Sequence, residues 1–340
     1  MANITQSDKE LKVPGLEVAR GSRGFTRIRA LEMADGARVE IPVIIARGEK
    51  PGPIFYMGAA FHGDEVNGVE IVARFAQEVD LTSLSGTVIA VPVQNPLAFQ
   101  VQHRYYVGHV MRSPLDQSPA DPWVCFPGEA DGNMAMRIAH VIFNTLMRHA
   151  DYYIDIHTPT TGGRYAPFAF LPTPRVGAIV EQAEAMARAF GADFILKTDD
   201  GVYVQETNPH TICARLGKVA MGIEIGEGGR LEADQVQRGV TGLENVLRHV
   251  GMLPGAVHKT GRQMVIREQH VIRATRGGLH HRHVELNQDL KRGDLCSTIV
   301  DVTGNVVEEI RATIDGAVVR IATVPIVNEG DRVVQLSVPV

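Results

Sequence analysis

The spacing of apolar positions predicts a region of alternating strands and helices followed by a region of strands alone. Residues 53–61 (PIFYMGAAF) and 86–93 (GTVIAVPV) are nearly continuous apolar runs, which are typical of buried strands. Between them, residues 66–79 carry apolar side chains at helical spacing. Further strands are predicted over 39–46, 152–156 and 219–225, and further helices over 135–147, 176–190 and 231–250. Strands that are apolar on both faces indicate a mostly parallel or mixed sheet that is covered by helices.

The pattern changes after Pro254-Gly255. Residues 262–340 contain short β-prone runs separated by turns, which favours a small all-β barrel or sandwich. The β-prone runs are 263–268, 270–275, 297–302, 305–313, 316–322 and 333–338. We therefore predict an α/β domain over residues 1–258 and a small β domain over 259–340, a division that suits a length of 340 residues.

Composition narrows the class of partner. The formal net charge is −5 and aromatic residues make up 6%, so neither nucleic acid nor an anionic membrane surface is an expected partner. Three widely spaced cysteines favour neither a disulfide framework nor a cysteine metal site. No apolar h-region or membrane-spanning run is present. These features favour a cytoplasmic protein that acts on a small molecule, and they leave a homo-oligomer open.

Metal-ligating residue types follow two of the predicted strands. His62 and Glu65 form an H-x-x-E pair between the strand at 53–61 and the next helix, and Gly63 would allow a sharp bend there. His157 ends the run YYIDIH, at the carboxyl end of another strand, where α/β folds place their ligands. Two imidazoles and one carboxylate suit a catalytic zinc ion, although the same ligands also accept cobalt or manganese.

Two carboxylates on buried strands complete the predicted site. Asp155 shares a strand face with His157 and would orient a metal ligand. Glu224, in GIEIG, interrupts an apolar strand, where an ionised side chain is costly without a partner or a task. Beside a metal-activated water it would act as the general base. Taken singly, His157 could be a core histidine and Glu224 a partner in a buried ion pair.

These residues resemble the succinylglutamate desuccinylase/aspartoacylase family, a branch of the zinc carboxypeptidase-like superfamily. The matching segments are 58–68 (GAAFHGDEVNG), 93–99 (VQNPLAF), 103–105 (HRY), 150–158 (ADYYIDIHT) and 222–226 (GIEIG). The resemblance implies a carboxypeptidase-like fold and a zinc hydrolase that removes an acyl group from an amino acid. It assigns the metal to His62, Glu65 and His157, and the general base to Glu224. It also implies that Arg104 stabilises the oxyanion.

One segment departs from the family pattern. The family carries Asp-Leu-Asn-Arg before Phe-Pro-Gly, and its Asn-Arg pair grips a substrate carboxylate. Here Trp123-Val124 stands at that place, before Phe126-Pro127-Gly128, and an apolar pair cannot bind a carboxylate as arginine does. Either the substrate lacks this carboxylate or another arginine replaces the pair. We expect Trp123 to line the substrate site, and the replacement candidates are Arg112, Arg164 and Arg215.

Several functions fit the sequence. The leading prediction is zinc-dependent hydrolysis of the amide bond of an N-acyl amino acid or related small N-acyl amine. The alternatives are an N-acetyl-diamino-acid deacetylase, a carboxypeptidase-like peptide hydrolase and a zinc-binding pseudoenzyme without turnover. The β domain resembles a biotinyl/lipoyl-like barrel but lacks a carrier lysine, the last lysine being Lys291. His280, His281 and His283 could form a second metal site, an exposed loop or part of the catalytic rim.

Overall fold

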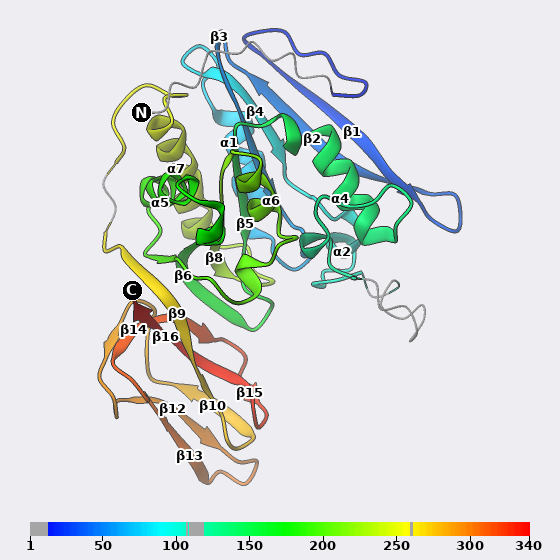
Figure 1. The fold of residues 1–340 in the computed structure, drawn as a ribbon. Coiled ribbons are helices and arrows are strands. Elements are labelled where there is room, and N and C mark those ends of the chain that lie inside the picture. The colour runs from blue at the N-terminus through cyan, green and yellow to red at the C-terminus, as the bar shows by residue number, and fades with distance from the viewer. Residues whose placement is uncertain (1–12, 107, 109–118, 259–260) are drawn as a thin grey trace.

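A computed structural model describes residues 13–106, 108, 119–258 and 261–340 (Figure 1). Arg112, one of the candidate substrate arginines, lies outside the described residues. The described chain forms a mixed α/β part that is followed by a strand-rich C-terminal part (Figure 1). None of its described helices is long and apolar enough to span a membrane.

A mixed sheet forms the centre of the α/β part, as the sequence predicted. Its strands run in the order β1-β2-β4-β3-β5-β8-β6-β7. Pairing is parallel through β4, β3, β5 and β8, and antiparallel at β1–β2, β2–β4 and β8–β6. The strands are β1 (Ser22–Glu32), β2 (Arg38–Arg47), β3 (Lys50–Ala59), β4 (Ser85–Val91), β5 (Tyr152–His157), β6 (Gly163–Phe170), β7 (Phe194–Leu196) and β8 (Val219–Glu227).

Helices cover both faces of this sheet. One face packs against α1 (Asn67–Glu78), α5 (Ile179–Phe190) and α7 (Ala233–His249). The other face packs against α4 (Met134–Thr145) and α6 (Pro209–Arg215). The short elements are α2 (Pro96–Gln100), η1 (Pro122–Val124), η2 (Met147–His149), η3 (Pro174–Val176) and η4 (Val202–Val204).

The two-residue period of the strands assigns the polar residues to one face. On β5, Ile154 and Ile156 point into the core under α1, α5 and α7, so Asp155 and His157 point to the opposite face. The same alternation places Glu224 on that opposite face. Because His157 and Glu224 are register partners on adjacent parallel strands, the fold brings them side by side at the carboxyl edge of the sheet.

The C-terminal part continues the large sheet and adds a second one. Its strands β9, β16, β14 and β11 extend the sheet beyond β7, giving twelve strands, while β13, β12, β10 and β15 form a separate four-stranded sheet. Apolar residues between Ile272 and Leu336 build a core of their own. The bounds are β9 (Met264–Arg273), β10 (Gly278–Arg282), β11 (Asp289–Leu290), β12 (Leu295–Val300), β13 (Val306–Arg311), β14 (Gly316–Ala322), β15 (Ile326–Val327) and β16 (Arg332–Pro339).

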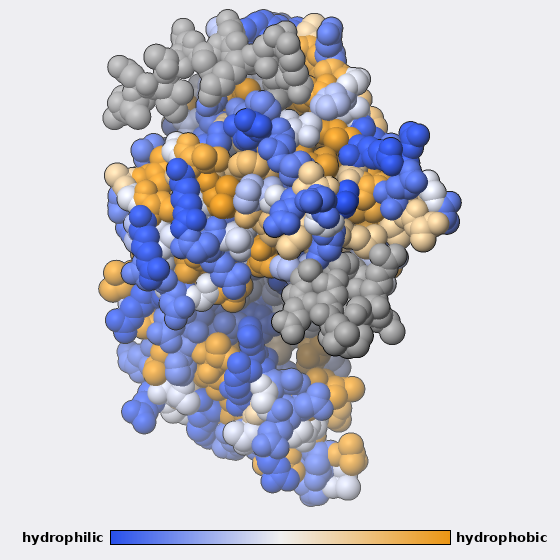
Figure 2. Space-filling view, turned by 45° about the vertical axis from the view of Figure 1, so that its right-hand side comes forward, coloured by the Kyte–Doolittle hydropathy of each residue, from blue (hydrophilic) through white to orange (hydrophobic). Residues whose placement is uncertain are grey.

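One detail differs from the prediction for this region. The β-prone runs 263–268 and 270–275 are not two strands, since most of both runs lies in the single strand β9. Its first residues pair with β7 and the remainder pairs with β16, so β9 joins the two parts of the molecule. A second connection comes from β14, which pairs with the start of β6. The lower part of Figure 2 shows one face of the C-terminal strands, and most of the residues visible there are hydrophilic. The domain division at 258/259 stays a prediction.

Candidate active site

The H-x-x-E pair lies in the loop between β3 and α1. His62 and Glu65 are both buried, and His62 Nδ1 lies 2.7 Å from Glu65 Oε1. Gly63 between them does not adopt a positive φ angle, so the sharp bend expected of it is not the reason for glycine. A Cβ at Gly63 would lie 1.9 Å from the carbonyl oxygen of Ala98, so this position requires the absence of a side chain. The loop is therefore held against α2.

His157 reaches the same point from the end of β5. Its Nδ1 lies 2.7 Å from Glu65 Oε2, so one carboxylate contacts both imidazoles. One ligand atom from each of His62, Glu65 and His157 lies within 4.8 Å of the others. Among the residues that the structure describes, this is the single group of three or more such side chains that could hold a metal ion. The structure thus brings the three predicted ligands together.

Two further carboxylates face the outer nitrogens of the imidazoles. His157 Nε2 lies 2.7 Å from Asp155 Oδ2, and His62 Nε2 lies 3.2 Å from Asp121 Oδ2. Ionised carboxylates only accept hydrogen bonds, so each Nε2 carries a proton and donates it. This arrangement leaves both Nδ1 atoms facing the inside of the group. Carboxylates in this outer position orient histidine ligands and raise their basicity.

The electrostatics of this group favour a cation. Burial by itself would lower the pKa of His157, but the negative charges of Asp155 and Glu65 raise it well above its usual value. The pKa of His62 is also raised, since Glu65 and Asp121 outweigh its burial and the charge of Arg104. Positive charge is therefore stabilised where the two Nδ1 atoms meet Glu65. Two imidazoles and a carboxylate form the donor set of many catalytic zinc sites, so these residues fit such an ion.

Glu224 lies beside this group with one oxygen held and the other free. Its Oε1 accepts a 3.0 Å hydrogen bond from the hydroxyl of Tyr203. Its Oε2 is buried and has no hydrogen-bond partner among the described residues. Burial and the charge of Glu65 raise the pKa of Glu224 to about 7. A carboxyl group with such a pKa can both accept and return a proton near neutral pH.

Arg104 borders the same group. Its guanidinium donates to Glu65 Oε1 at 3.3 Å and lies 3.6 Å from Asp121 Oδ2. The side chain keeps 25% of its surface exposed, so it faces both the carboxylates and the open space above them. Its pKa is raised above the usual value because Glu65 and Asp121 outweigh its burial. It is a fixed cation beside the predicted metal ligands.

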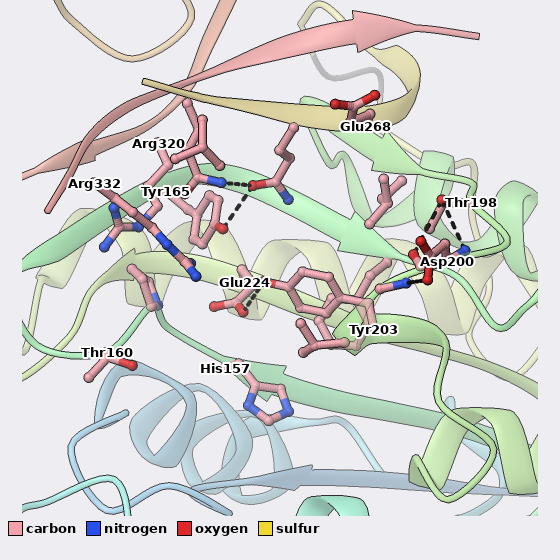
Figure 3. Close-up of a pocket in the computed structure, with 18 of the residues that line it drawn as sticks. His157, Thr160, Tyr165, Thr198, Asp200, Tyr203, Glu224, Glu268, Arg320 and Arg332 are labelled. Atoms are coloured by element: carbon pink, nitrogen blue, oxygen red, sulfur yellow. Dashed lines mark hydrogen bonds between the residues drawn. The ribbon is translucent and has the colours of Figure 1, made fainter. Parts of the chain in front are cut away.

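A cavity of roughly 860 Å³ opens above these residues, and its wall includes His62, His157 and Glu224 (Figure 3). Trp123 also lines it, with its ring 5.5 Å from that of His157 and stacked at 5.9 Å on that of His210. The C-terminal strands complete the wall with Arg267, Glu268, Gln269, Arg320, Arg332 and Gln335.

Other predicted residues lie elsewhere. Arg164 pairs with Glu232 at 2.7 Å, and Arg215 pairs with Glu206 on an exposed face of α6. Neither arginine is among the residues that line the cavity. His280, His281 and His283 lie on or directly after β10, outside the cavity wall. His280 contacts Ser297 and His283 contacts Thr298, and they form no metal-holding group within the described chain.

Two residues of the site were not singled out from the sequence. Asp121 contacts His62 from the turn before η1, and Tyr203 contacts Glu224 from η4. Asp121 belongs to the segment before Phe126-Pro127-Gly128, where the family pattern also carries an aspartate, so a signal was present in the sequence. Tyr203 lies in a short turn without periodicity, and its own sequence neighbours do not indicate a role.

Comparison with known proteins identifies the family of this chain. Residues 51–250 match the succinylglutamate desuccinylase/aspartoacylase catalytic domain. The N-alpha-acetyl-L-2,4-diaminobutyric acid deacetylase of Halomonas elongata is 26% identical over 322 residues, which cover 90% of this chain and 87% of that protein.

Solved structures agree over nearly the whole chain. The succinylglutamate desuccinylase/aspartoacylase of Rhodobacter sphaeroides superposes with a TM-score of 0.78 at 26% identity, covering 94% of this chain and 96% of that one. The product-bound ectoine utilization protein EutE of Ruegeria pomeroyi also gives a TM-score of 0.78 at 26% identity, covering 93% and 94%. Since the matched catalytic domain spans more than half of its length, the chain belongs to the succinylglutamate desuccinylase/aspartoacylase family, whose members are deacylating hydrolases.

Proposed function

We propose that the protein is a zinc-dependent deacylase that hydrolyses the amide bond of a small N-acyl amino acid. The observation that carries this proposal is the juxtaposition of the His62-Glu65-His157 group with Glu224, whose Oε2 is buried and free of a partner. A metal-holding group beside an unengaged carboxylate is the minimum needed for metal-assisted hydrolysis. The order of strands in the α/β part supports a carboxypeptidase-like sheet as its scaffold.

The metal ligands, Glu224 and Tyr203 have separate roles in the proposed reaction. Zinc, held by His62, Glu65 and His157, supplies Lewis-acid polarisation of a carbonyl and acidification of water when it is bound. Glu224 takes the proton of the attacking water and returns it to the leaving nitrogen. Tyr203 holds one oxygen of Glu224, so the other faces the reacting atoms.

Arg104 and the outer carboxylates assist this chemistry. The guanidinium of Arg104 donates hydrogen bonds to the acyl oxygen as negative charge develops on it. Asp155 and Asp121 keep His157 and His62 in the tautomer whose Nδ1 faces inwards. The ring of Trp123 excludes water from one side of the cavity.

An N-acetylated diamino acid is the substrate that we propose first. The Halomonas elongata relative is a deacetylase of N-alpha-acetyl-L-2,4-diaminobutyric acid and aligns over 90% of this chain. A cavity of roughly 860 Å³ readily admits a molecule of this size. We further propose that residues 259–340 act as a β domain that closes one side of this cavity, and that the protein works in the cytoplasm.

The test combines metal content with turnover. Purified wild type should contain close to one zinc per chain, and His62→Ala should lose it. Glu224→Gln should retain the metal while its kcat on N-acetyl-2,4-diaminobutyrate falls by about 100- to 10,000-fold, because the general base is removed. Wild type that binds no zinc, or Glu224→Gln with unchanged kcat, would contradict the proposal.

A further inference from the structure

We propose that Arg320 and Arg332, from the C-terminal strands, form the carboxylate-binding site of the catalytic cavity. This inference rests on the proposed function and specifies its substrate class: N-acyl amino acids with a free carboxylate. The two arginines lie more than 90 residues beyond Glu224 in the chain, so the site exists only in the folded molecule.

Arg104 and two of the three arginines predicted from the sequence are already engaged. Arg104 is held by Glu65 and Asp121, next to the position where the acyl oxygen would lie. Arg164 is paired with Glu232, and Arg215 with Glu206. Within the described residues, neither Arg320 nor Arg332 has an acidic partner within ion-pair distance. A substrate carboxylate is the partner that such cavity-lining guanidinium groups favour.

The sheet places Arg320 close to the reacting centre. On β14, Arg320 is the register partner of Tyr165 on β6, and the same strand β6 pairs on its other edge with β8, which carries Glu224. Cross-strand partners on one face lie about 5 Å apart at Cβ. One strand therefore separates the arginine from the general base. Figure 3 shows Arg320, Arg332 and Tyr165 on the same side of the cavity, above Glu224 and His157.

Local packing holds the guanidinium of Arg320 without neutralising it. The guanidinium lies over Gly163, where a Cβ would be 2.2 Å from Nη2. Its Nη1 is buried and has no hydrogen-bond partner among the described residues. A buried, unpaired N–H of a cation is costly, and a bound carboxylate would remove that cost. A side chain at position 163 would thus displace the charged group from this place.

The neighbouring polar groups complete the wall. The hydroxyl of Tyr165 and the amide of Gln335 both donate to Gln269 Oε1, at 2.9 Å each. Burial and the charge of Glu224 raise the pKa of Tyr165 to about 12, while the charges of Arg320 and Arg332 act in the opposite direction. Both guanidinium groups therefore lie near enough to this hydroxyl to influence it. Planar guanidinium groups at one end of a cavity fix the orientation of a carboxylate.

The experiment compares N-acetyl-2,4-diaminobutyrate with its α-carboxamide, in which an uncharged amide replaces the carboxylate. Wild type should favour the carboxylate in kcat/KM by about 10- to 100-fold, the range expected for a charge-assisted hydrogen bond. Arg320→Met and Arg332→Met should lose most of this preference through a raised KM and keep their activity on the carboxamide within about twofold. Arg311→Met is the matched control, since Arg311 is an exposed arginine of the same β region that pairs with Glu309 outside the cavity.

Gly163→Ala gives a second, independent variant. It displaces the guanidinium of Arg320 without removing a charge, so it should lose the preference for the carboxylate as Arg320→Met does. Variants that keep the wild-type preference, or that lose both substrates equally, would overturn the assignment. If wild type hydrolyses neither compound, the proposed function fails. Calorimetric binding of the two compounds then still tests the arginines, and equal binding by wild type and Arg320→Met rejects them.

Discussion

At the scale of single residues, the site depends on which nitrogen or oxygen atom of each side chain makes each contact. Glu65 bridges the two histidines with both oxygens, while Glu224 is held by one oxygen only. The sequence could identify His62, Glu65, His157 and Glu224, because a polar side chain that follows or interrupts an apolar strand is conspicuous. It could not show what those side chains contact, since His62 and Asp121 are 59 residues apart.

Asp155→Asn should weaken zinc binding. Asp155 is fully buried, and its Oδ2 accepts a hydrogen bond from His157 Nε2. A neutral amide stabilises the histidine ligand less, so the zinc dissociation constant should rise by about 10- to 100-fold. Competition with a chelator measures this constant. An unchanged dissociation constant would show that Asp155 contributes to the protein core and not to zinc binding.

Tyr203→Phe should move the acid limb of the pH–rate profile. The Tyr203 hydroxyl donates to Glu224 and stabilises its carboxylate form, so it lowers the pKa of that residue. Without this donor the pKa of Glu224 rises. Glu224 is then protonated, and cannot act as a base, at a higher pH than in the wild type. The midpoint of the acid limb of kcat/KM should therefore shift upwards by up to about one unit, the size expected for one hydrogen bond. A shift downwards would exclude this role.

At the scale of elements, apolar patterning predicted those strands and helices that are apolar or amphipathic over their whole length. The predicted helix at 66–79 corresponds to α1, and the predicted strand at 219–225 to β8. The predictions did not include β6, β7 and α6. Strand β6 contains Pro167 and charged Arg164, β7 has three residues, and α6 has seven. These elements exist because neighbouring strands and the core select them, which local propensity does not reveal.

Gly63→Ala should disable the metal site through the backbone. Its Cβ would meet the carbonyl of Ala98 at 1.9 Å, so the loop between β3 and α1 must move. His62 and Glu65 flank this position, and a displaced loop separates their ligand atoms from His157. We expect zinc content to fall well below one per chain while circular dichroism stays native. Gly261→Ala is a suitable control, because Gly261 also lies outside the helices and strands, does not adopt a positive φ and has no atom within 4 Å of such a Cβ.

At the scale of the whole molecule, four of the C-terminal strands (β9, β16, β14 and β11) are part of the large sheet. Strands β9 and β14 pair with β7 and β6, and Ala317 and Val319 of β14 pack into the core that also contains Trp123. The sequence predicted two regions from the change in pattern near Pro254. It could not predict that their strands would pair, because that pairing depends on unoccupied strand edges far away in the chain.

Thermal unfolding should therefore be a single transition. The two parts share ladder hydrogen bonds and buried apolar surface, so unfolding of one part exposes the edge and core of the other. Differential scanning calorimetry of the metal-loaded protein is expected to give one peak. Two resolved peaks would show that the C-terminal strands unfold independently of the catalytic sheet.

The sequence by itself determined the mixed α/β class, the strand-only C-terminal region and the set of residues able to hold a metal. Each of these follows from neighbours in the chain: the period of apolar positions, and a histidine or carboxylate where an apolar run ends or is interrupted. Tertiary structure decided the partners of those residues. It placed Asp121 on His62, Tyr203 on Glu224 and the guanidinium of Arg320 in the cavity, and it directed Arg215 to an exposed pair with Glu206. The physical reason is that charge, burial and hydrogen bonding act through space, whereas a sequence pattern records only proximity along the chain.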